Sequence, residues 1–353
     1  MRRKRKRKQI ISTVILCILL VLVAAGMVYL GSKMKEQEKG QDLTSDSSVV
    51  TQEEEVQQQS QIDEELLENE ITETPTPEPT QEVQQAEQIS SEGLNSSYAY
   101  LVRRDDMAVL MDLAGEERIY PASMTKIMTA ILAIEKLQNL DETITVPEEI
   151  FASLTEQGAS VAGFYPYEKV TVRSLLYGVL LPSGADACLT LAQKISGSEE
   201  EFVKLMNDKA AELGMSGTQF ANCTGLHQEE HYSTCQDIAK LMNYSLQNDT
   251  FRTVISSSKY TTEALSGHAE GITVYSTMFG KFNDNQFSTT LDNGAVIEGG
   301  KTGYTDEAGL CLASFAKYSE KEYILVTAGA MTFSGSDTAN VRDAITVYGR
   351  LTE

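Results

Sequence analysis

The chain has 353 residues, 41% of them hydrophobic, and a formal net charge of −22 at neutral pH. This length suffices for one large or two modest domains, and so acidic a balance argues against nucleic acid as a partner. Seven of the 29 basic residues lie within residues 2–8, so the rest of the chain is more acidic than the net charge shows.

The first 31 residues predict a membrane anchor. A basic tail, residues 1–9, precedes an apolar stretch, residues 10–31, that as a helix spans about 30 Å, the thickness of a hydrocarbon core. The alternative is a signal peptide cleaved within residues 23–26, but the apolar run is longer than such peptides carry. By the positive-inside rule the tail stays in the cytoplasm and the bulk of the chain lies on the extracytoplasmic side.

Residues 32–95 predict a disordered linker. They are rich in Glu, Gln, Ser and Thr, with a Pro/Thr segment at residues 74–80, and bury too little apolar surface to offset the entropy of ordering. As a flexible coil they reach roughly 45 Å. A short helix over residues 62–71 is the alternative. One catalytic domain is expected over residues 96–353.

Beyond the linker, strand patterns stand at both ends of a helical middle. Apolar runs at residues 98–102 and 108–113, about a charged turn, predict a hairpin. Helices are expected after Ser123 and over residues 172–181, 185–195, 202–213, 238–246 and 338–351. Strands are expected over residues 272–276, 295–297, 310–316 and 323–328. The terminal segments should therefore meet in one antiparallel sheet, giving an α+β fold with helices on its faces.

The string S-x-x-K occurs four times, and its context selects one occurrence. The four begin at Ser32, Ser123, Ser256 and Ser314. Only Ser123 follows a proline and precedes apolar residues at helical spacing. If Ser123 starts a helix, its hydroxyl lies at the positive end of the helix dipole, and Lys126 lies on the same face one turn later. This pairs a nucleophile with a base.

Three motifs follow one another along the chain: Ser123-Met124-Thr125-Lys126, Ser183-Gly184-Ala185 and, at the expected start of a strand, Lys301-Thr302-Gly303. With S-x-x-K, S-x-N and K-T-G elements in this order, the chain resembles the active-site serine penicillin-recognising enzymes. Among these it is most similar to low-molecular-mass penicillin-binding proteins that are D-alanyl-D-alanine carboxypeptidases. The resemblance covers residues 97–352 and includes segments 121–129, 180–184, 222–226, 231–234 and 301–305.

The resemblance implies a β-lactamase/penicillin-binding-protein-like transpeptidase fold, with an antiparallel sheet, flanking helices and a helical subdomain. It also implies roles for individual residues. Ser123 would be the nucleophile, Lys126 its base, and Ser183 the relay that passes a proton to the leaving amine. The backbone N–H groups of Ser123 and Tyr304 would form the oxyanion hole, where a tetrahedral intermediate needs donors.

The third motif is expected to serve both the base and the substrate. A lysine accepts a proton only when its amine is neutral part of the time, and burial beside a second cation lowers an ammonium pKa. Lys301 is the available cation, expected to lower the pKa of Lys126. By resemblance, Lys301 and Thr302 hold the terminal D-alanine carboxylate, and Gly303 and Tyr304 complete the substrate-binding segment.

The sequence departs from the family pattern at two places. Ala185 stands where the family usually has the Asn of S-x-N, and Asp186 after it is the candidate for a partial replacement. Met331 stands before residues 332–333, where some members carry an Arg that helps bind the carboxylate. Because the chain ends soon after Leu351, we expect the N-terminal helix to replace the C-terminal anchor of many relatives.

His227 and His231 stand four apart with two glutamates between them, which resembles a metal-binding pattern. The string is not H-E-x-x-H and shows no third ligand. We therefore expect no metal, and a role for His231 in fixing the loop before Ser233.

The cysteines of the outer domain divide into two pairs. Cys188 and Cys311 fall at apolar positions and predict buried thiols. Cys223 and Cys235 flank the histidine loop, where a disulfide can form outside the cell.

The first functional hypothesis is a carboxypeptidase that uses Ser123 to remove the terminal D-alanine from peptidoglycan stem peptides, without a cofactor, and that β-lactams acylate. The second is a catalytically weak β-lactam-sensing or wall-binding domain that lost turnover with the Asn. The third is a β-lactamase, ranked last because no deacylating glutamate is recognisable.

Overall fold

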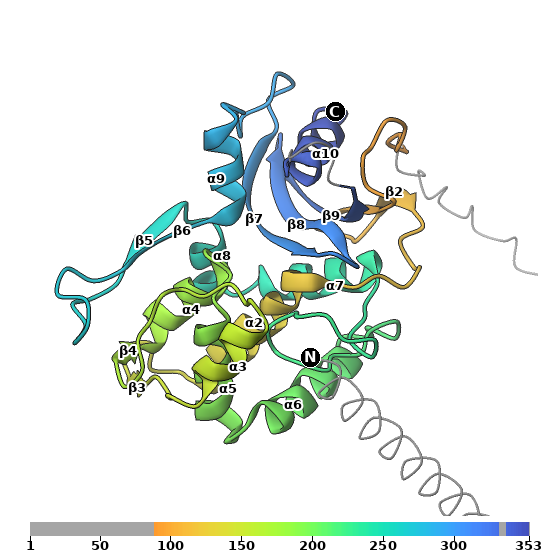
Figure 1. Cartoon of the computed structure of the whole chain (residues 1–353). Helices are drawn as coiled ribbons and strands as arrows, with labels where there is room; N and C mark the ends of the chain where they lie inside the picture. The colour runs from red at the N-terminus through yellow and green to blue at the C-terminus, as the bar shows by residue number, and fades with distance from the viewer. Residues whose placement is uncertain (1–87, 332–336, 353) are drawn as a thin grey trace, which may run out of the picture. The chain divides into compact units, whose positions relative to one another are not determined.

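A five-stranded antiparallel sheet with strand order β2-β1-β9-β8-β7 organises the structure (Figure 1). Its strands are β1 (Tyr98–Arg103), β2 (Val109–Leu113), β7 (Val296–Thr305), β8 (Gly309–Tyr318) and β9 (Lys321–Ala330). The computed structural model describes residues 88–331 and 337–352. As predicted, the N-terminal hairpin joins strands from the C-terminal part of the chain. The tail, the anchor and the linker up to residue 87 lie outside the described residues.

Both faces of this sheet are covered. In β1, Tyr100 and Val102 belong to the larger apolar core, whereas Ala99 and Leu101 belong to a second core on the opposite face. Successive strand side chains point to opposite faces, so burial of both faces explains why the long strands read as continuous apolar runs. Helix α7 (Cys235–Ser245) packs on β1 and β9, whereas α10 (Ala339–Tyr348) packs on β8 and β9, and α9 (Thr277–Asp284) packs on β7.

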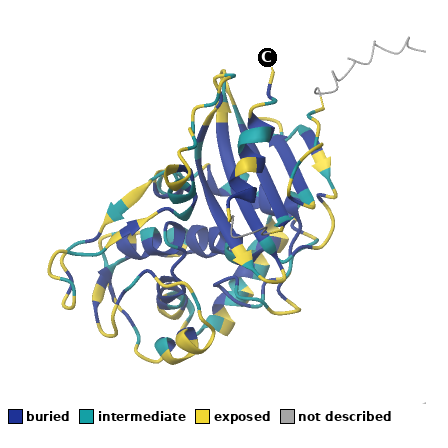
Figure 2. Cartoon of the chain, turned by 45° about the horizontal axis from the view of Figure 1, so that its top comes forward, coloured by how far each residue is buried: buried dark blue, intermediate teal, exposed yellow. Residues whose placement is uncertain are grey.

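Helix α2 (Lys126–Lys136) is the centre of the helical part. Its first eight residues are all buried, which suits a helix that has neighbours on every side (Figure 2). The helices that contact it are α4 (Val172–Leu180), α5 (Ala185–Ser196), α6 (Glu199–Glu212), α7 and α8 (Asp249–Ile255). The remaining elements are α3 (Ile150–Glu156) and two small hairpins, β3 (Thr143–Thr145) with β4 (Lys169–Thr171) and β5 (Lys259–Thr261) with β6 (Thr273–Tyr275).

Capping side chains set two of the helix starts. The Ser198 hydroxyl accepts from the Glu201 N–H at 3.2 Å, and the Thr234 hydroxyl accepts from the Asp237 N–H at 3.0 Å. Because these caps satisfy free N–H groups, α6 and α7 begin directly after them, three residues before the predicted starts at 202 and 238.

Two predicted features differ from the structure. Lys301-Thr302-Gly303 was expected at the start of a strand, but it lies in the interior of β7, which begins at Val296. Helices α3, α8 and α9 and the three-residue strands β3, β4 and β5 were not predicted, since each of these elements is short.

Packed structure begins before the predicted boundary at residue 96. The Ile89 N–H donates to the Leu110 carbonyl at 2.7 Å, and Leu94 packs against the second core.

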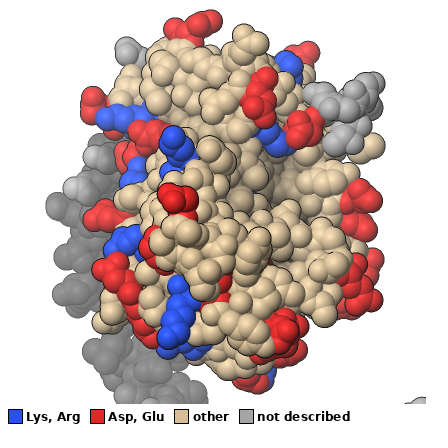
Figure 3. All heavy atoms as spheres, turned by 60° about the vertical axis from the view of Figure 1, so that its left-hand side comes forward, with Lys and Arg blue, Asp and Glu red and all other residues tan. Residues whose placement is uncertain are grey.

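Within the described part of the chain, no helix is long and apolar enough to cross a membrane. One face of the molecule carries its charged side chains mainly around the edge of a central uncharged region (Figure 3).

A single buried carboxylate joins residues 95–96, just before β1, to the last helix, α10. Asp343 is 1% exposed and accepts from the backbone N–H groups of Asn95 and Ser96, at 2.9 and 2.8 Å, and from both their side chains. We predict that Asp343→Ala, which leaves these donors unsatisfied, lowers the free energy of unfolding by about 2–4 kcal/mol. Urea denaturation measures the change.

Asp141→Ala is the matched control, because Asp141 makes a 3.0 Å ion pair with Arg173 while its side chain is 79% exposed. Such a pair contributes under about 1 kcal/mol. Equal losses in the two variants would contradict the role given to Asp343.

Candidate active site

Ser123 lies in a single 3-10 turn, η1 (Ala122–Thr125), that leads into α2. The expectation that the serine starts the α-helix is therefore refined, because α-helical geometry begins only at Lys126. Side chains three residues apart are nearly eclipsed in 3-10 geometry, which brings these two together. The Lys126 Nζ donates to the Ser123 Oγ at 3.0 Å.

The Lys126 amine is enclosed. The residue is 3% exposed, and its Nζ also donates to the backbone carbonyl of Thr224. Burial disfavours the charged form and lowers the pKa of Lys126 below its ordinary value of 10.5. A lowered pKa leaves part of the amine neutral, as a base next to a serine requires.

Lys301 is the second buried amine. It is fully buried, its Nζ donates to the Thr302 carbonyl at 2.8 Å, and its pKa lies well below the ordinary value. Burial is the main cause, and the charge of Lys126 lowers the Lys301 pKa further. We expected the charge of Lys301 to lower the pKa of Lys126. In the structure, the charge of Lys126 lowers the pKa of Lys301 instead, and burial is what lowers the pKa of Lys126.

The loop over residues 222–226 holds the carbonyl that Lys126 contacts. The Asn222 Oδ1 accepts from the N–H groups of Thr224 and Gly225, at 3.2 and 2.7 Å, which fixes the turn. Gly225 has φ of +80°, and a Cβ there would lie 2.0 Å from the Ala122 carbonyl oxygen and 2.9 Å from the Ser123 nitrogen. Only glycine permits both the conformation and the contact.

The edge strand β7 meets the serine from the other direction. A Cβ added to Gly303 would lie 3.0 Å from the Ser123 nitrogen and 3.0 Å from the Ala122 Cβ. The K-T-G motif therefore runs directly beside η1, and the backbone of Tyr304 follows at the same edge.

Ser183 lies in the turn between α4 and α5 and reaches the site through its neighbours. It is 6% exposed with φ of +67°, and its Oγ has no hydrogen-bond partner among the described residues. The Thr277 N–H donates to the Leu181 carbonyl at 3.0 Å, and the hydroxyls of Thr277 and Thr302 are 2.6 Å apart. An unsatisfied hydroxyl in a strained turn is typical of a functional site.

Asp186 does not replace the missing amide at Ala185. Its carboxylate accepts from the N–H groups of Ala162, Gly163 and Phe164 at 2.7, 3.1 and 3.2 Å. These bonds hold the loop before β4 onto the start of α5. Ala185 itself is buried and adds no polar side chain.

The two histidines do not form a common site. Because the His231 Nδ1 accepts from the Ala221 N–H at 3.0 Å, the neutral ring carries its proton on Nε2, which lies 2.7 Å from the Thr125 hydroxyl. Burial lowers the pKa of His231 to about 4. His231 thus fixes its loop to η1, as predicted, while His227 lies 3.8 Å from the carboxylates of Glu229 and Glu307.

The four cysteines of the described chain are free and buried, so the disulfide considered between Cys223 and Cys235 is not formed. Burial raises the pKa of all four thiols, that of Cys188 to about 12. They therefore pack as small apolar side chains.

The structure thus gathers Ser123, Lys126 and the Lys301–Tyr304 segment around one point, with the Ser183 turn linked to it through Thr277. Two contributors were missed. The Thr224 carbonyl is a backbone group with no residue-type signal, and Thr277 follows an ordinary capping serine. Fold and site together define the class of proteins in which a lysine amine acts as the base for a nucleophilic serine.

The family model for D-alanyl-D-alanine carboxypeptidases (Peptidase S11) matches residues 82–332, and the chain belongs to this family. It is 37% identical over 243 residues to the D-alanyl-D-alanine carboxypeptidase DacF of Bacillus subtilis, covering 66% of this chain and 57% of DacF. It is 34% identical over 260 residues to the D-alanyl-D-alanine carboxypeptidase of Streptomyces sp. strain K15, covering 71% of this chain and 85% of the relative.

The fold is that of the Streptomyces K15 DD-transpeptidase. Its crystal structure superposes with a TM-score of 0.65 at 28% identity, covering 74% of this chain and 99% of that one. The match to DacF, in contrast, leaves more than a third of that relative unaligned.

Gly225 gives a direct test of the close approach at the nucleophile. We predict that Gly225→Ala reduces the rate of Ser123 acylation by a fluorescent penicillin roughly 100-fold, since the added Cβ forces η1 to move by about 1 Å. Gly197→Ala is the matched control, because Gly197 has φ of +79° and open space at its Cβ position. Equal acylation rates in both variants would show that the contact does not matter.

Proposed function

We propose that this protein is a serine-type D-alanyl-D-alanine carboxypeptidase that removes the terminal D-alanine from peptidoglycan stem peptides. The observation that carries the proposal is the 3.0 Å hydrogen bond between the Ser123 hydroxyl and the buried Lys126 amine, whose pKa is lowered. Membership of the family and the names of its relatives support the substrate class.

Acylation begins when Ser123 Oγ attacks the carbonyl carbon of the penultimate D-alanine and gives its proton to neutral Lys126. The tetrahedral oxyanion is bound by the backbone N–H groups of Ser123 and Tyr304. Lys301 and Thr302 hold the terminal carboxylate. The C–N bond then breaks, and the leaving amine takes a proton by way of Ser183.

Deacylation reverses the use of the same groups. Water attacks the ester on Ser123 as its proton passes to the base, the ester C–O bond breaks, and Ser123 recovers its proton. The peptide leaves one residue shorter. A β-lactam follows the first half of this path, because its ring amide presents a carbonyl to the same hydroxyl, and we propose that β-lactams inhibit the enzyme in this way.

The proposal includes the location of the enzyme. The apolar stretch at residues 10–31 and the basic tail before it support a single membrane-spanning helix, with the N-terminus in the cytoplasm and the catalytic domain on the cell-wall side. Substrate and enzyme would then share one compartment.

Replacing the nucleophile tests the proposal. We predict that Ser123→Ala in the full-length chain abolishes both labelling by a fluorescent penicillin and release of D-alanine from a D-Ala-D-Ala peptide. Ser256→Ala is the control, since Ser256 begins another S-x-x-K string but lies at the end of α8. Labelling without D-alanine release in the unaltered chain would favour the sensing domain, and rapid penicillin turnover would favour the β-lactamase.

The protonation state of Lys126 gives a pH prediction. The amine is active when unprotonated, so the acylation rate should rise with pH through a midpoint below 10.5, since burial lowers the Lys126 pKa. Lys126→Arg keeps the charge but stays protonated. We expect this variant to lose this pH dependence and about 10²–10⁴ of the rate. Stopped-flow acylation measures both.

Lys259→Arg is the matched control, because Lys259 is the exposed lysine of the Ser256 string. A rate that does not change with pH in the unaltered chain would exclude Lys126 as the base.

A further inference from the structure

Three exposed apolar side chains lie close together in the loop over residues 157–168, which joins α3 to β4. They are Val161, Tyr165 and Tyr167, with exposed fractions of 45%, 54% and 63%. The part of the chain that the structure describes has seven such large exposed side chains, so this short loop carries almost half of them. Single exposed apolar residues are ordinary on a protein surface, whereas a cluster marks a binding surface.

Tyr165 and Tyr167 belong to one tight turn over residues 165–168, here called the aromatic turn. The Glu168 N–H donates to the Tyr165 carbonyl at 3.3 Å, which closes the turn. Pro166 stands at its second position, and Tyr167 at the third has φ of +66°. These are features of a type II turn, whose third position favours glycine. A tyrosine there carries backbone strain, which is typical of functional segments.

A buried carboxylate holds the aromatic turn in place. Glu168 is 1% exposed, and it accepts from the Tyr165 N–H at 2.9 Å and from the Gly267 N–H at 2.8 Å. Its Oε1 also lies 3.0 Å from the His268 Nδ1. The fold thus buries a charged group to fix the backbone of a surface turn whose own tyrosines stay exposed. A fixed turn that presents rigid aromatic rings loses little conformational entropy when it binds a ligand.

The same loop borders the Ser183 turn of the active site. The Ala185 N–H donates to the Ser160 carbonyl at 2.8 Å. A Cβ added to Gly184 would lie 2.7 Å from the Ala162 Cβ, so the two backbones are in direct contact. A molecule held by this loop would therefore lie beside the acylation site.

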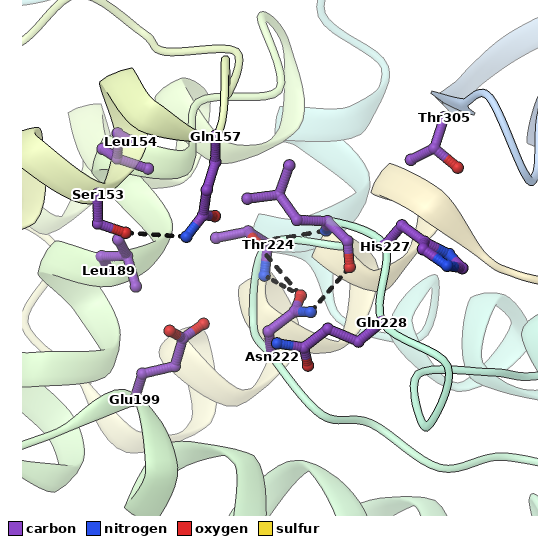
Figure 4. Close-up of a pocket in the computed structure, with 11 residues that line it drawn as sticks. Ser153, Leu154, Gln157, Leu189, Glu199, Asn222, Thr224, His227, Gln228 and Thr305 are labelled. Carbon is purple, nitrogen blue, oxygen red and sulfur yellow. Dashed lines mark hydrogen bonds between the residues drawn. The ribbon is translucent and has the colours of Figure 1, made fainter. Parts of the chain in front are cut away.

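The loop begins at a cavity that belongs to the acylation site (Figure 4). This cavity, here called the Glu199 cavity, has a volume of about 460 Å³ and is lined by Glu199, Thr224 and Thr305 among others. Gln157, the first residue of the loop, also lines it. From there the chain passes the Ser183 turn and reaches the aromatic turn, which is thus the outer part of a continuous surface.

The charges near the aromatic turn disfavour an anionic partner. Residues 141–170 include six acidic residues and one basic residue, Lys169. Residues 262–272, which supply the Gly267 and His268 contacts, include two glutamates and neither Lys nor Arg. A polyphosphate or an anionic bilayer would be repelled by this surface.

The remaining groups suit a neutral chain that carries many hydroxyls. Each tyrosine offers an apolar ring face together with a hydroxyl group. The Tyr167 hydroxyl donates to the carboxylate of Glu148, which is itself exposed and can accept further hydrogen bonds. Sugar rings combine C–H faces with hydroxyls at their edges, and so they match this combination of groups.

We propose that the aromatic turn binds the glycan strands of peptidoglycan, with the Tyr165 and Tyr167 rings packed against the C–H faces of the sugars. The ligand class is a neutral chain of N-acetylated amino sugars. This contact with the cell wall is separate from recognition of the peptide at Ser123 and needs no catalysis. Only its effect on the cleavage of polymeric substrate rests on the proposed function.

Co-sedimentation with insoluble peptidoglycan, stripped of anionic wall polymers, tests the binding. The full-length chain is used in detergent with Ser123→Ala throughout, so that cleavage does not alter the polymer. We expect a soluble hexamer of N-acetylglucosamine to compete and release the protein. Replacing Tyr165 and Tyr167 together by alanine should weaken binding about tenfold, as the loss of two aromatic contacts implies.

The controls separate the ring faces from the fold of the loop. Phenylalanine at both positions keeps the rings and should keep the affinity within about twofold. Tyr275→Ala removes a tyrosine that is 62% exposed on β6, and should bind as the unaltered chain does. Because the Tyr165 ring also contacts the ring of His268, Tyr167→Ala alone is the second variant, with an expected loss of about threefold.

Three results of these binding assays would overturn the inference. The first is equal sedimentation of the alanine pair and the unaltered chain. The second is no release by the hexamer. The third is binding to anionic phospholipid vesicles that depends on the same two tyrosines, which would assign the turn to the membrane.

D-alanine release, measured with Ser123 intact, distinguishes glycan binding from catalysis. The alanine pair should cleave a soluble D-Ala-D-Ala peptide as fast as the unaltered chain, but release D-alanine from insoluble peptidoglycan about tenfold more slowly. An equal loss on both substrates would place the effect in the active site and overturn the inference. If the unaltered chain releases D-alanine from neither substrate, the proposed function fails, while sedimentation still decides whether the turn binds glycan.

Discussion

The whole site depends on one buried amine. Lys126 donates to the Ser123 hydroxyl and to the Thr224 carbonyl, and it is almost completely removed from water. Because neither partner is charged, nothing in direct contact repays the cost of burying an ammonium ion, and the pKa falls. The fold therefore makes Lys126 a base by burying its amine.

Enclosure requires that backbone segments approach one another more closely than side chains allow. Gly225 lies against η1 on one side and Gly303 lies against it on the other, and at each position a Cβ would reach 3.0 Å or less from the Ser123 nitrogen. The central helix and the edge of the sheet can meet at the serine only because both residues lack a side chain. Asn222 and His231 then hold the loop in place.

The site also has a direction. Thr302 and Thr277 mark one end, where the leaving D-alanine would lie, and Thr305 with the Glu199 cavity marks the other. The reacting bond lies between them, so the two ends can recognise different parts of one extended peptide.

The sequence by itself determined what depends on near neighbours and on apolar patterns. Ser123 and Lys126 are three residues apart, so one turn suffices to pair them. The terminal strands were recognisable because burial on both faces leaves continuous apolar runs, and the helix caps because a hydroxyl before a helix has a local partner. Three contacts were decided by the tertiary structure alone. Asp186 accepts from the backbone of the loop before β4. The Thr224 carbonyl accepts from Lys126, 98 positions away in the sequence, and the Thr277 hydroxyl contacts that of Thr302. Such contacts join distant segments, often through backbone groups that every residue carries, so only the packed chain specifies them.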